Sequence, residues 1–245
     1  MSHPTLWAVV PVKAFAFAKQ RLAPVLAAHE RAALARAMFA DVLQALARNP
    51  FLAGALVVTQ DAEAAAMARG AGAGVLSDPP ESGLTPALSY AARTLAGARR
   101  AGMLVVPADL PLITCADIEL IALGHRSSPA VTLVAAGSDG GTNALACSPP
   151  DAMPFFFGEN SFRRHLDCAR TLGLAPRVLT LPRFGRDIDR PDDLLAFLER
   201  PSATRTHAFL LASGIAQRLR SPQTAEPARS REFTGGKAAQ LHPKG

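Results

Sequence analysis

Aromatic residues other than Phe are scarce in this chain of 245 residues, which has one Trp and one Tyr, and only 19% of its residues are charged. Proteins that bind nucleic acid combine a basic face with aromatic side chains that stack on bases. Long apolar runs are missing as well, and none approaches the ~20 residues that a membrane-spanning helix needs. We therefore expect neither nucleic acid nor a membrane as a partner.

Cysteine is also infrequent. Cys115, Cys147 and Cys168 are scattered along the chain, without the CxxC spacing of a zinc site. An odd and dispersed set of cysteines is typical of a protein kept in a reducing compartment. No basic region or cleavage site precedes the apolar segment LWAVVPV (6–12). We therefore expect no signal peptide and a cytoplasmic location.

Positive charge is concentrated at one end of the chain. Residues 201–245 contain seven Lys or Arg and two acids, which accounts for +5 of the formal net charge of +6 and leaves +1 for residues 1–200. Residues 221–245 are too poor in apolar side chains to fold alone. We expect a folded domain at 1–200, a docked helix at 201–220 and a basic, disordered tail at 221–245.

Apolar runs alternate with segments of helical periodicity, which predicts an α/β fold: a Rossmann-like, mostly parallel sheet with helices on both faces. The runs at 131–136 and 143–147 are separated by a loop instead of a helix, so we expect a mixed β extension in the second half. Ligands of such sheets bind beyond the carboxyl ends of the strands. The other expected strands are 6–12, 55–59, 74–78, 103–108 and 177–181, and the main helices are 30–48, 85–100 and 160–172.

Several familiar catalytic and nucleotide-binding motifs are absent. The chain has no GxxxxGK[ST], HExxH or GxSxG sequence. The glycines of GAGAG (70–74) follow a predicted helix and precede a predicted strand, the reverse of the order in a dinucleotide-binding fingerprint. We interpret them as a helix stop.

Three acids form the first candidate site. Within MLVVPADLPLI (103–113), the first apolar run stops at Asp109, and a carboxylate beside a buried strand needs a cationic partner. In GRDIDRPDDL (185–194), Asp187 and Asp189 share a face if the segment is extended. Such a set of carboxylates suits Mg²⁺. Asp189 could instead cap the helix that begins at Pro191.

Two further segments could bind anions. VPVKAFAFAKQRL (10–22) places Lys13, Lys19 and Arg21 after the first strand, where they either contact a bound phosphate or form a solvated loop. DGGTNALACSPPDAMPFFFGENSF (139–162) contains Thr142 and then Gly158 and Ser161 at the start of a predicted helix, a typical position for an anion. Ser161 could alternatively serve only as a helix cap.

The order VPVK…AK.RL, GL..AL, ADLPL, GGTNAL, FG..SF..H and DID.P.DL resembles the guanylyltransferases that make coenzyme F-420, which are relatives of the molybdopterin guanylyltransferases. The resemblance implies a fold of the nucleotide-diphospho-sugar transferase type. It also implies that GTP reacts with a small phosphorylated three-carbon acid and that pyrophosphate leaves. The acids concerned are 3-phospho-D-glycerate, phosphoenolpyruvate and 2-phospho-L-lactate. Arg outnumbers Lys 22 to 4, which is typical of a G+C-rich bacterial gene and disfavours 2-phospho-L-lactate as the acceptor.

The resemblance also implies roles for individual residues. Lys13, Lys19 and Arg21 would face the triphosphate, and the Gly83–Leu84 loop would lie near the base. GLTPAL has Thr85 and Pro86 where the family pattern has an Asn-containing loop, so the base contacts differ. A downstream deazaflavin transferase becomes a candidate partner, and no oligomeric state follows. Mg²⁺ would be held by Asp109, Asp187 and Asp189, and the phospho-acid by Thr142, Gly158 and Ser161.

The implied reaction needs no general base, because the attacking phosphate oxygen is already anionic. His165, which lies two turns into its predicted helix, is accordingly not assigned as one. Two rival interpretations stay open. A molybdopterin- or sugar-phosphate-type nucleotidyltransferase usually has a glycine-rich loop after the first strand, whereas residues 10–22 contain no glycine. A non-catalytic nucleotide sensor has no need for three acids.

Overall fold

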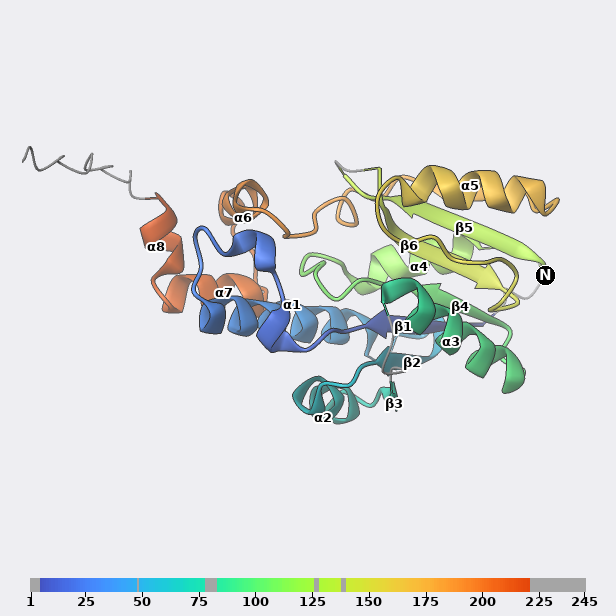
Figure 1. Cartoon of the computed structure of the whole chain (residues 1–245), viewed down its shortest axis with the longest axis horizontal. Coiled ribbons are helices and arrows are strands. Elements are labelled where there is room, and N and C mark those ends of the chain that lie inside the picture. Colours follow the sequence, from blue (N-terminus) through green and yellow to red (C-terminus); the bar gives the residue numbers. More distant parts are fainter. Residues whose placement is uncertain (1–4, 48, 78–82, 126–127, 138–139, 221–245) are drawn as a thin grey trace, which may run out of the picture.

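The computed structural model describes residues 5–47, 49–77, 83–125, 128–137 and 140–220. Strands and helices alternate along most of this length (Figure 1). The strands are β1 (Leu6–Pro11), β2 (Leu52–Val58), β3 (Gly74–Leu76), β4 (Gly102–Val105), β5 (Ala130–Ala135), β6 (Thr142–Ser148) and β7 (Arg177–Leu179). The helices are α1 (Ala28–Leu46), α2 (Ala62–Gly70), α3 (Leu84–Gly97), α4 (Cys115–Gly124), α5 (Ser161–Thr171), α6 (Pro191–Leu198), α7 (Arg205–Ala212) and α8 (Ile215–Arg220). Two short 3₁₀ turns, η1 (Phe15–Phe17) and η2 (Gln20–Leu22), follow β1.

The strands form one seven-stranded sheet in the order β3-β2-β1-β4-β6-β5-β7. The pairs β1–β2, β1–β4, β2–β3 and β5–β7 are parallel, whereas β6 runs antiparallel to both of its neighbours, β4 and β5. The predicted fold class, a mostly parallel sheet with a mixed extension in its second half, is confirmed.

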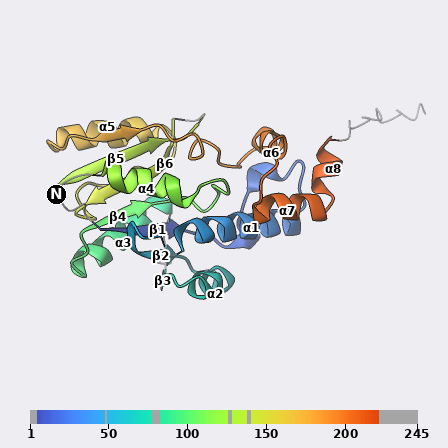
Figure 2. The same ribbon diagram turned by 180° about the vertical axis from the view of Figure 1, so that it is seen from behind.

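Helices cover both faces of the sheet, as the alternation of strands and helices predicts. Successive side chains of β1 point to opposite faces, so Val10 packs in one buried cluster with α1, α2 and α4, and Val9 packs in another with α3 and α5. Figures 1 and 2 show the two layers, with α3 and α5 toward the viewer in the first view and α4 toward the viewer from behind.

The antiparallel direction of β6 decides where the site forms. Val105, the last residue of β4, pairs with Leu145 of β6. The first residues of β6, Thr142 and Asn143, therefore lie beyond the carboxyl end of β4. Asp109 follows that same end of β4, so the edge of the sheet where ligands are expected contains side chains from both strands.

The C-terminal part of the described chain packs on α1. Two helices, α7 and α8, occupy the region where one docked helix was predicted, and Gly214 separates them with a φ of +72°. Leu210 and Ile215 are fully buried. The buried carboxylate of Asp41 in α1 accepts hydrogen bonds from the first backbone N–H groups of α7, at 2.8 and 2.9 Å. The tail predicted at 221–245 lies outside the described residues.

No helix in the described part of the chain is both long and apolar enough to cross a membrane.

Candidate active site

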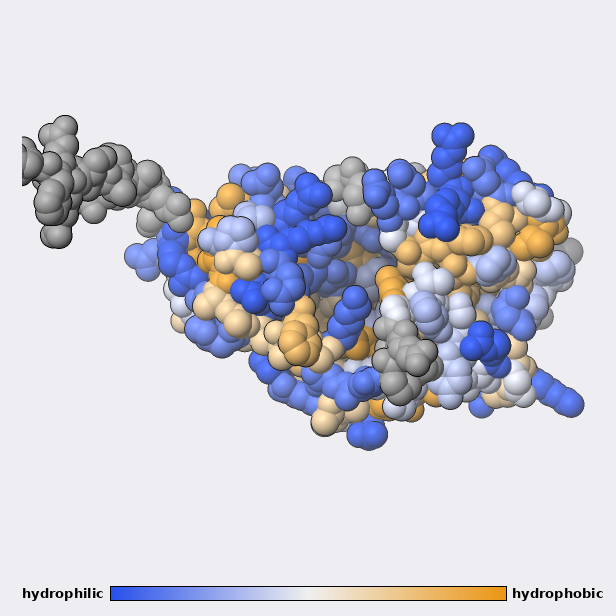
Figure 3. Space-filling model, in the orientation of Figure 1, coloured by the Kyte–Doolittle hydropathy of each residue, from blue (hydrophilic) through white to orange (hydrophobic). Residues whose placement is uncertain are grey.

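A pocket of about 440 Å³ opens at the carboxyl end of β1. Its walls come from the segment after β1, from the start of α3 and from the turn after β4. In the space-filling view this face of the molecule is hollowed, and hydrophilic residues gather along its rim (Figure 3). The pocket is lined by residues that include Lys13, Phe15, Phe17, Lys19, Gly83, Leu84, Pro107, Asp109 and Asp189.

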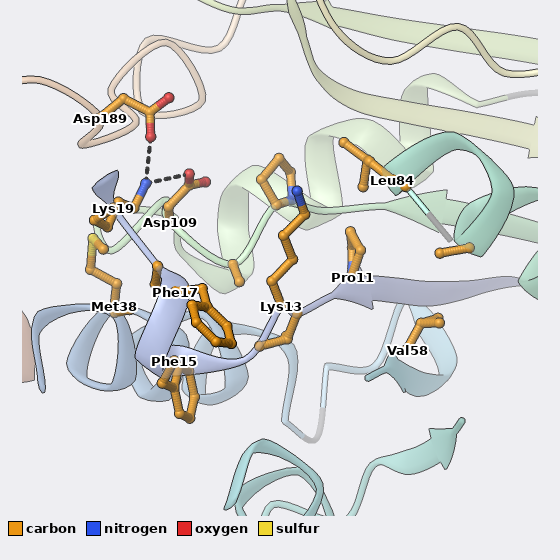
Figure 4. Close-up of a pocket in the computed structure, with 17 residues that line it drawn as sticks. Pro11, Lys13, Phe15, Phe17, Lys19, Met38, Val58, Leu84, Asp109 and Asp189 are labelled. Atoms are coloured by element: carbon orange, nitrogen blue, oxygen red, sulfur yellow. Dashed lines mark hydrogen bonds and ion pairs between the residues drawn. The ribbon is translucent and has the colours of Figure 1, made fainter. Parts of the chain in front are cut away.

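Lys19 connects two of the predicted acids. Its Nζ donates to Asp109 Oδ2 at 2.6 Å and to Asp189 Oδ1 at 2.6 Å, although 90 and 170 residues separate the partners in sequence (Figure 4). Burial alone would lower the pKa of the Lys19 ammonium, but the two carboxylates more than offset it and raise that pKa above its ordinary value. Lys19 therefore stays charged and supplies the cation that Asp109 requires.

Asp189 is held in its ionised form. Its burial would raise the pKa of the carboxyl, but the charge and hydrogen bond of Lys19, together with Arg21, lower the pKa below its usual value. Arg21 Nη1 lies 3.5 Å from Asp189 Oδ2. Asp189 could alternatively have capped α6, but Asp193 has that role. Its Oδ2 accepts hydrogen bonds from the backbone N–H groups of Asp189 and Arg190.

The other pocket residues predicted from sequence lie around this ion pair. Lys13 is exposed, and its side chain extends between the Lys19–Asp109 pair and Leu84 in the close-up (Figure 4). Gly83 and Leu84 form the start of α3 and the opposite wall. The structure thus brings Lys13, Lys19, Gly83 and Leu84 into one pocket with Asp109 and Asp189.

The segment after β1 is fixed by contacts made outside the pocket. The backbone N–H of Phe15 donates to Asp61 Oδ2 at 3.0 Å, and Asp61 also caps α2. Lys19 has a left-handed backbone, with a φ of 52°, which a residue other than glycine or asparagine rarely adopts. Strain of this kind costs on the order of 1–3 kcal/mol and persists where surrounding contacts enforce it. Lys19 makes its two ion pairs from this backbone conformation.

Asp187 has a different environment from Asp189. Its Oδ1 accepts a hydrogen bond from Asn143 Nδ2 at 2.9 Å, and Asn143 also donates to the carbonyl of Phe184 at 2.6 Å. Burial, together with the negative charge of Asp109, raises the pKa of Asp187, and the Asn143 hydrogen bond opposes only part of that rise. Asp109 and Asp187 are therefore close enough to repel each other.

The chemistry of these acids fits a hard divalent cation. Asp109 and Asp187 present carboxylate oxygens whose mutual repulsion a cation would relieve, and within the described ranges no basic side chain pairs with Asp187. As arranged here, the Lys19 ammonium lies between Asp109 and Asp189. No group of three or more metal-binding side chains is assembled in the part of the chain that the structure describes. The assignment of all three acids to Mg²⁺ stays a prediction.

The predicted acceptor residues form a second cluster at the start of β6 and α5. Ser161 Oγ donates to Thr142 Oγ1 at 3.2 Å, and both side chains are buried. Ser161 is the first residue of α5 and makes no capping hydrogen bond, so the cap interpretation is wrong. Gly158 is exposed and has a φ of +124°, a conformation that favours glycine. The backbone N–H of Phe162 donates to the carbonyl of Gly140 at 3.0 Å, which ties the two loops together.

Two residues of this region were not assigned a role from the sequence. Asn143 orients Asp187, and His165 contacts Thr142 Oγ1 through Nδ1 at 3.0 Å. His165 lies four residues after Ser161, which is one helical turn, so both residues lie on the same face of α5. The prediction that His165 lies two turns into its helix is therefore wrong. Both residues belong to the quoted patterns GGTNAL and FG..SF..H, so the signal was present, but only the packing of β6 shows their partners.

This arrangement defines a class of protein. A mixed α/β sheet has at its carboxyl edge a pocket with lysines and acids, and the start of β6 adds a second cluster of buried hydroxyl groups. These are the features of a nucleotidyltransferase. Comparison with known proteins narrows the class: residues 6–229 match the family model described as "Guanylyl transferase CofC like", and the chain belongs to that family.

Relatives and solved structures agree with this assignment. The chain is 41% identical to phosphoenolpyruvate guanylyltransferase of Roseiflexus sp. (strain RS-1) over 80% of its own length and 86% of the relative's. It is 35% identical to 3-phospho-D-glycerate guanylyltransferase of Colwellia psychrerythraea over 79% of its own length and 92% of the relative's. A putative nucleotide-diphospho-sugar transferase from Desulfovibrio desulfuricans G20 has the same fold, with a TM-score of 0.72 at 16% identity, covering 88% and 98% of the two chains. The chain is a guanylyltransferase.

Proposed function

We propose that this enzyme transfers GMP from GTP to a small phosphorylated three-carbon acid and releases pyrophosphate, as a step in coenzyme F-420 biosynthesis. One observation carries the proposal: Thr142 and Asn143, neighbours on β6, serve two different clusters. Thr142 contacts Ser161 at the start of α5, and Asn143 contacts Asp187 beside the Lys19 pocket. β6 therefore contributes two consecutive residues, one to each cluster, at the point where its regular pairing with β5 is interrupted.

GTP binds in the pocket of Lys13 and Lys19. Its 440 Å³ volume lies in the range of small-molecule sites. Lys13 lines the pocket, and Arg21 lies next to Asp189; both are exposed and face the triphosphate. The Gly83–Leu84 wall lies next to the base. Thr85 and Pro86 follow in the first turn of α3. Proline lacks an N–H donor, so guanine recognition in this loop depends on other groups.

Mg²⁺ is the proposed metal, and the carboxylates of Asp109, Asp187 and Asp189 are the groups that would hold it. Bound there, it would add positive charge next to the triphosphate and the departing pyrophosphate. Asn143 fixes the orientation of Asp187 through its hydrogen bond. Lys19 keeps Asp109 and Asp189 in place through its two ion pairs.

The acceptor binds at Thr142, Gly158 and Ser161, where hydroxyl groups and the start of α5 attract an anion. An oxygen of the acceptor phosphate attacks the α-phosphorus of GTP, and the bond to the bridging oxygen of the β-phosphate breaks, so the electron pair leaves with pyrophosphate. No proton has to be removed from the nucleophile. His165 is consistent with this, since both of its ring nitrogens are occupied by hydrogen bonds and neither is free to act as a base.

Phosphoenolpyruvate and 3-phospho-D-glycerate are the preferred acceptors, and 2-phospho-L-lactate is the next. All three present a phosphate and a carboxylate. The two relatives described above are named for the first two.

The test is pyrophosphate release from GTP in the presence of each of the three acids. We expect release only when GTP and one phospho-acid are both present. Glycerate and pyruvate serve as matched controls without phosphate, and ATP and CTP as matched nucleotides. Equal release with a sugar phosphate would favour the rival type of nucleotidyltransferase. Guanosine nucleotide binding without turnover of any acceptor would favour a sensor.

A further inference from the structure

His165 is a buried histidine beside the acceptor cluster, with no exposed surface. Its ring lies among the aromatic rings of Phe156 and Phe157, with centroids 5.8 and 4.9 Å away. Both ring nitrogens make hydrogen bonds. Nδ1 lies 3.0 Å from Thr142 Oγ1, and Nε2 accepts the backbone N–H of Phe156 at 2.8 Å.

The bond from Phe156 determines where the imidazole proton resides. A backbone N–H can only donate, so Nε2 must carry a lone pair. In the neutral ring the proton is then on Nδ1, and Nδ1–H donates to Thr142 Oγ1. Burial and, to a smaller extent, the charge of Arg164 lower the pKa of His165 to about 4, so the ring is neutral near pH 7.

This tautomer has a consequence for the two hydroxyl groups. Thr142 Oγ1 accepts from His165, so its own proton is not used in that bond. One hydrogen bond joins Thr142 and Ser161 and uses one of their two hydroxyl protons. One O–H of the pair therefore remains without an acceptor among the described residues. With the opposite tautomer, Thr142 would donate to Nδ1, and no hydroxyl proton would remain.

We propose that His165 is a positioning residue that makes the Thr142–Ser161 pair present an O–H donor, and not a lone pair, to an anionic oxygen of the acceptor. The inference rests on the proposed function, since it gives a selective role to the acceptor cluster described above. The same geometry disfavours acceptors whose group at this point is a hydroxyl or amide donor. His165 touches neither substrate and acts through Thr142.

Two substitutions of His165 test the roles of its two ring nitrogens separately. The side-chain amide of Asn reaches the position of Nδ1, and that of Gln reaches the position of Nε2. His165→Asn therefore keeps a donor for Thr142 and loses the acceptor for Phe156. His165→Gln keeps the acceptor for Phe156 and loses the donor for Thr142.

The expected result is a selective change in the KM for phosphoenolpyruvate or whichever of the three acids is turned over. His165→Gln should raise it roughly tenfold to a hundredfold, the usual effect of a lost hydrogen bond to a charged group. His165→Asn should stay within about threefold of the wild type. The KM for GTP should not change in either variant. A structural role alone would give equal effects that follow the melting temperature, and that result would overturn the proposal.

The chain offers a matched control in His125. This histidine is also fully buried and contacts a Thr and a Ser hydroxyl, with Nδ1 3.0 Å from Thr132 Oγ1 and Nε2 2.9 Å from Ser148 Oγ. It lies outside the acceptor cluster. His125→Gln should lower the melting temperature and leave both KM values unchanged. A raised acceptor KM in His125→Gln would mean that loss of packing alone produces the effect, which would contradict the proposal.

Two further measurements separate this inference from the proposed function. Thr142→Val removes the hydroxyl itself. An unchanged acceptor KM in this variant would contradict the acceptor site and the role of His165 together. A raised acceptor KM in Thr142→Val with a normal one in His165→Gln would contradict the role of His165 alone. Nitrogen NMR of the imidazole needs no substrate and should show the proton on Nδ1 of His165; a proton on Nε2 would overturn the tautomer and the proposal.

Discussion

Charge is unevenly distributed among the three acids of the site. Asp189 is paired with Lys19 and Arg21, and Asp109 with Lys19, whereas Asp187 has a neutral partner, Asn143. The pKa of Asp187 is raised by burial and by the charge of Asp109. Its ionised form therefore costs folding free energy, and only a bound cation would recover that cost.

Asp187→Asn should abolish most of the activity without loss of stability. The substitution removes a charge that opposes folding, so we expect a melting temperature equal to or above that of the wild type. It also removes a proposed metal ligand, so kcat/KM should fall a hundredfold or more, in line with the several kcal/mol that a metal contributes. Steady-state kinetics and a melting curve decide the matter.

The control lies six residues further on. Asp193→Ala removes the cap of α6, which contributes about 1 kcal/mol to folding, and frees the backbone N–H groups of Asp189 and Arg190 without removing a carboxylate from the pocket. It should lower the melting temperature and reduce the activity far less than Asp187→Asn does. A fully active Asp187→Asn enzyme would contradict the role of Asp187 in metal binding.

The two buried histidines predict a pH dependence of stability. Burial lowers the pKa values of His125 and His165 to about 4, from 6.5 in the unfolded chain. Between these values the unfolded state binds more protons, so the free energy of unfolding falls as the pH falls below 6.5. When the pH falls from 7 to 5, we expect each histidine to reduce the free energy of unfolding by about 2 kcal/mol.

Denaturant unfolding at several pH values measures this dependence. His125→Gln should have a shallower dependence than the wild type, because one titrating group is absent. An identical slope in the two proteins would contradict the low pKa of His125.

At the scale of secondary-structure elements, local patterns were sufficient for most of the sheet and insufficient for the site. Short apolar runs predicted each strand found in the described ranges, and the loop between residues 136 and 142 indicated that β5 and β6 break the parallel order. The direction of β6 was not predictable, because it depends on which neighbours the strand meets. The pairing of Asn143 with Asp187 and of His165 with Thr142 follows from that direction.

The loop after β1 is a second example. Its lysines could be identified as candidates from their place after a strand, but a solvated loop has the same sequence features. The long-range contacts of Lys19 and the bond from Phe15 to Asp61 distinguish the two cases. Such contacts join residues that are far apart in sequence, so no local pattern contains them.

The C-terminal helices provide a prediction at this scale. Leu210 and Ile215 are fully buried, and Asp41 binds the start of α7. Truncation after Arg200 would expose the apolar face of α1 and leave Asp41 without its partners, so we expect a loss of several kcal/mol of stability. Truncation after Arg220 should leave both the melting temperature and the activity unchanged, because residues 221–245 are too polar to contribute to a core.

Melting curves of the two truncated chains test this division. Equal stability of both would mean that α7 and α8 do not contribute to the fold. A marked loss of activity in the longer truncated chain would mean that the tail takes part in substrate binding.

At the scale of the whole molecule, the sheet brings two groups of polar side chains together at one edge. Parallel strands bring Lys13, Lys19 and Asp109 to one edge, and the antiparallel β6 adds Thr142 and Asn143 to the same edge. The rest of the fold consists of two helical layers, each packed on one face of the sheet in its own buried cluster.

The central claim is that these two sites join GMP to a phospho-acid. Phosphorus NMR of a reaction between GTP and phosphoenolpyruvate tests it most directly, with 3-phospho-D-glycerate as the second acceptor. We expect the paired signals of a diphosphate substituted at both ends, together with an equal amount of pyrophosphate. GDP and inorganic phosphate, or pyrophosphate accompanied by free GMP, would contradict it.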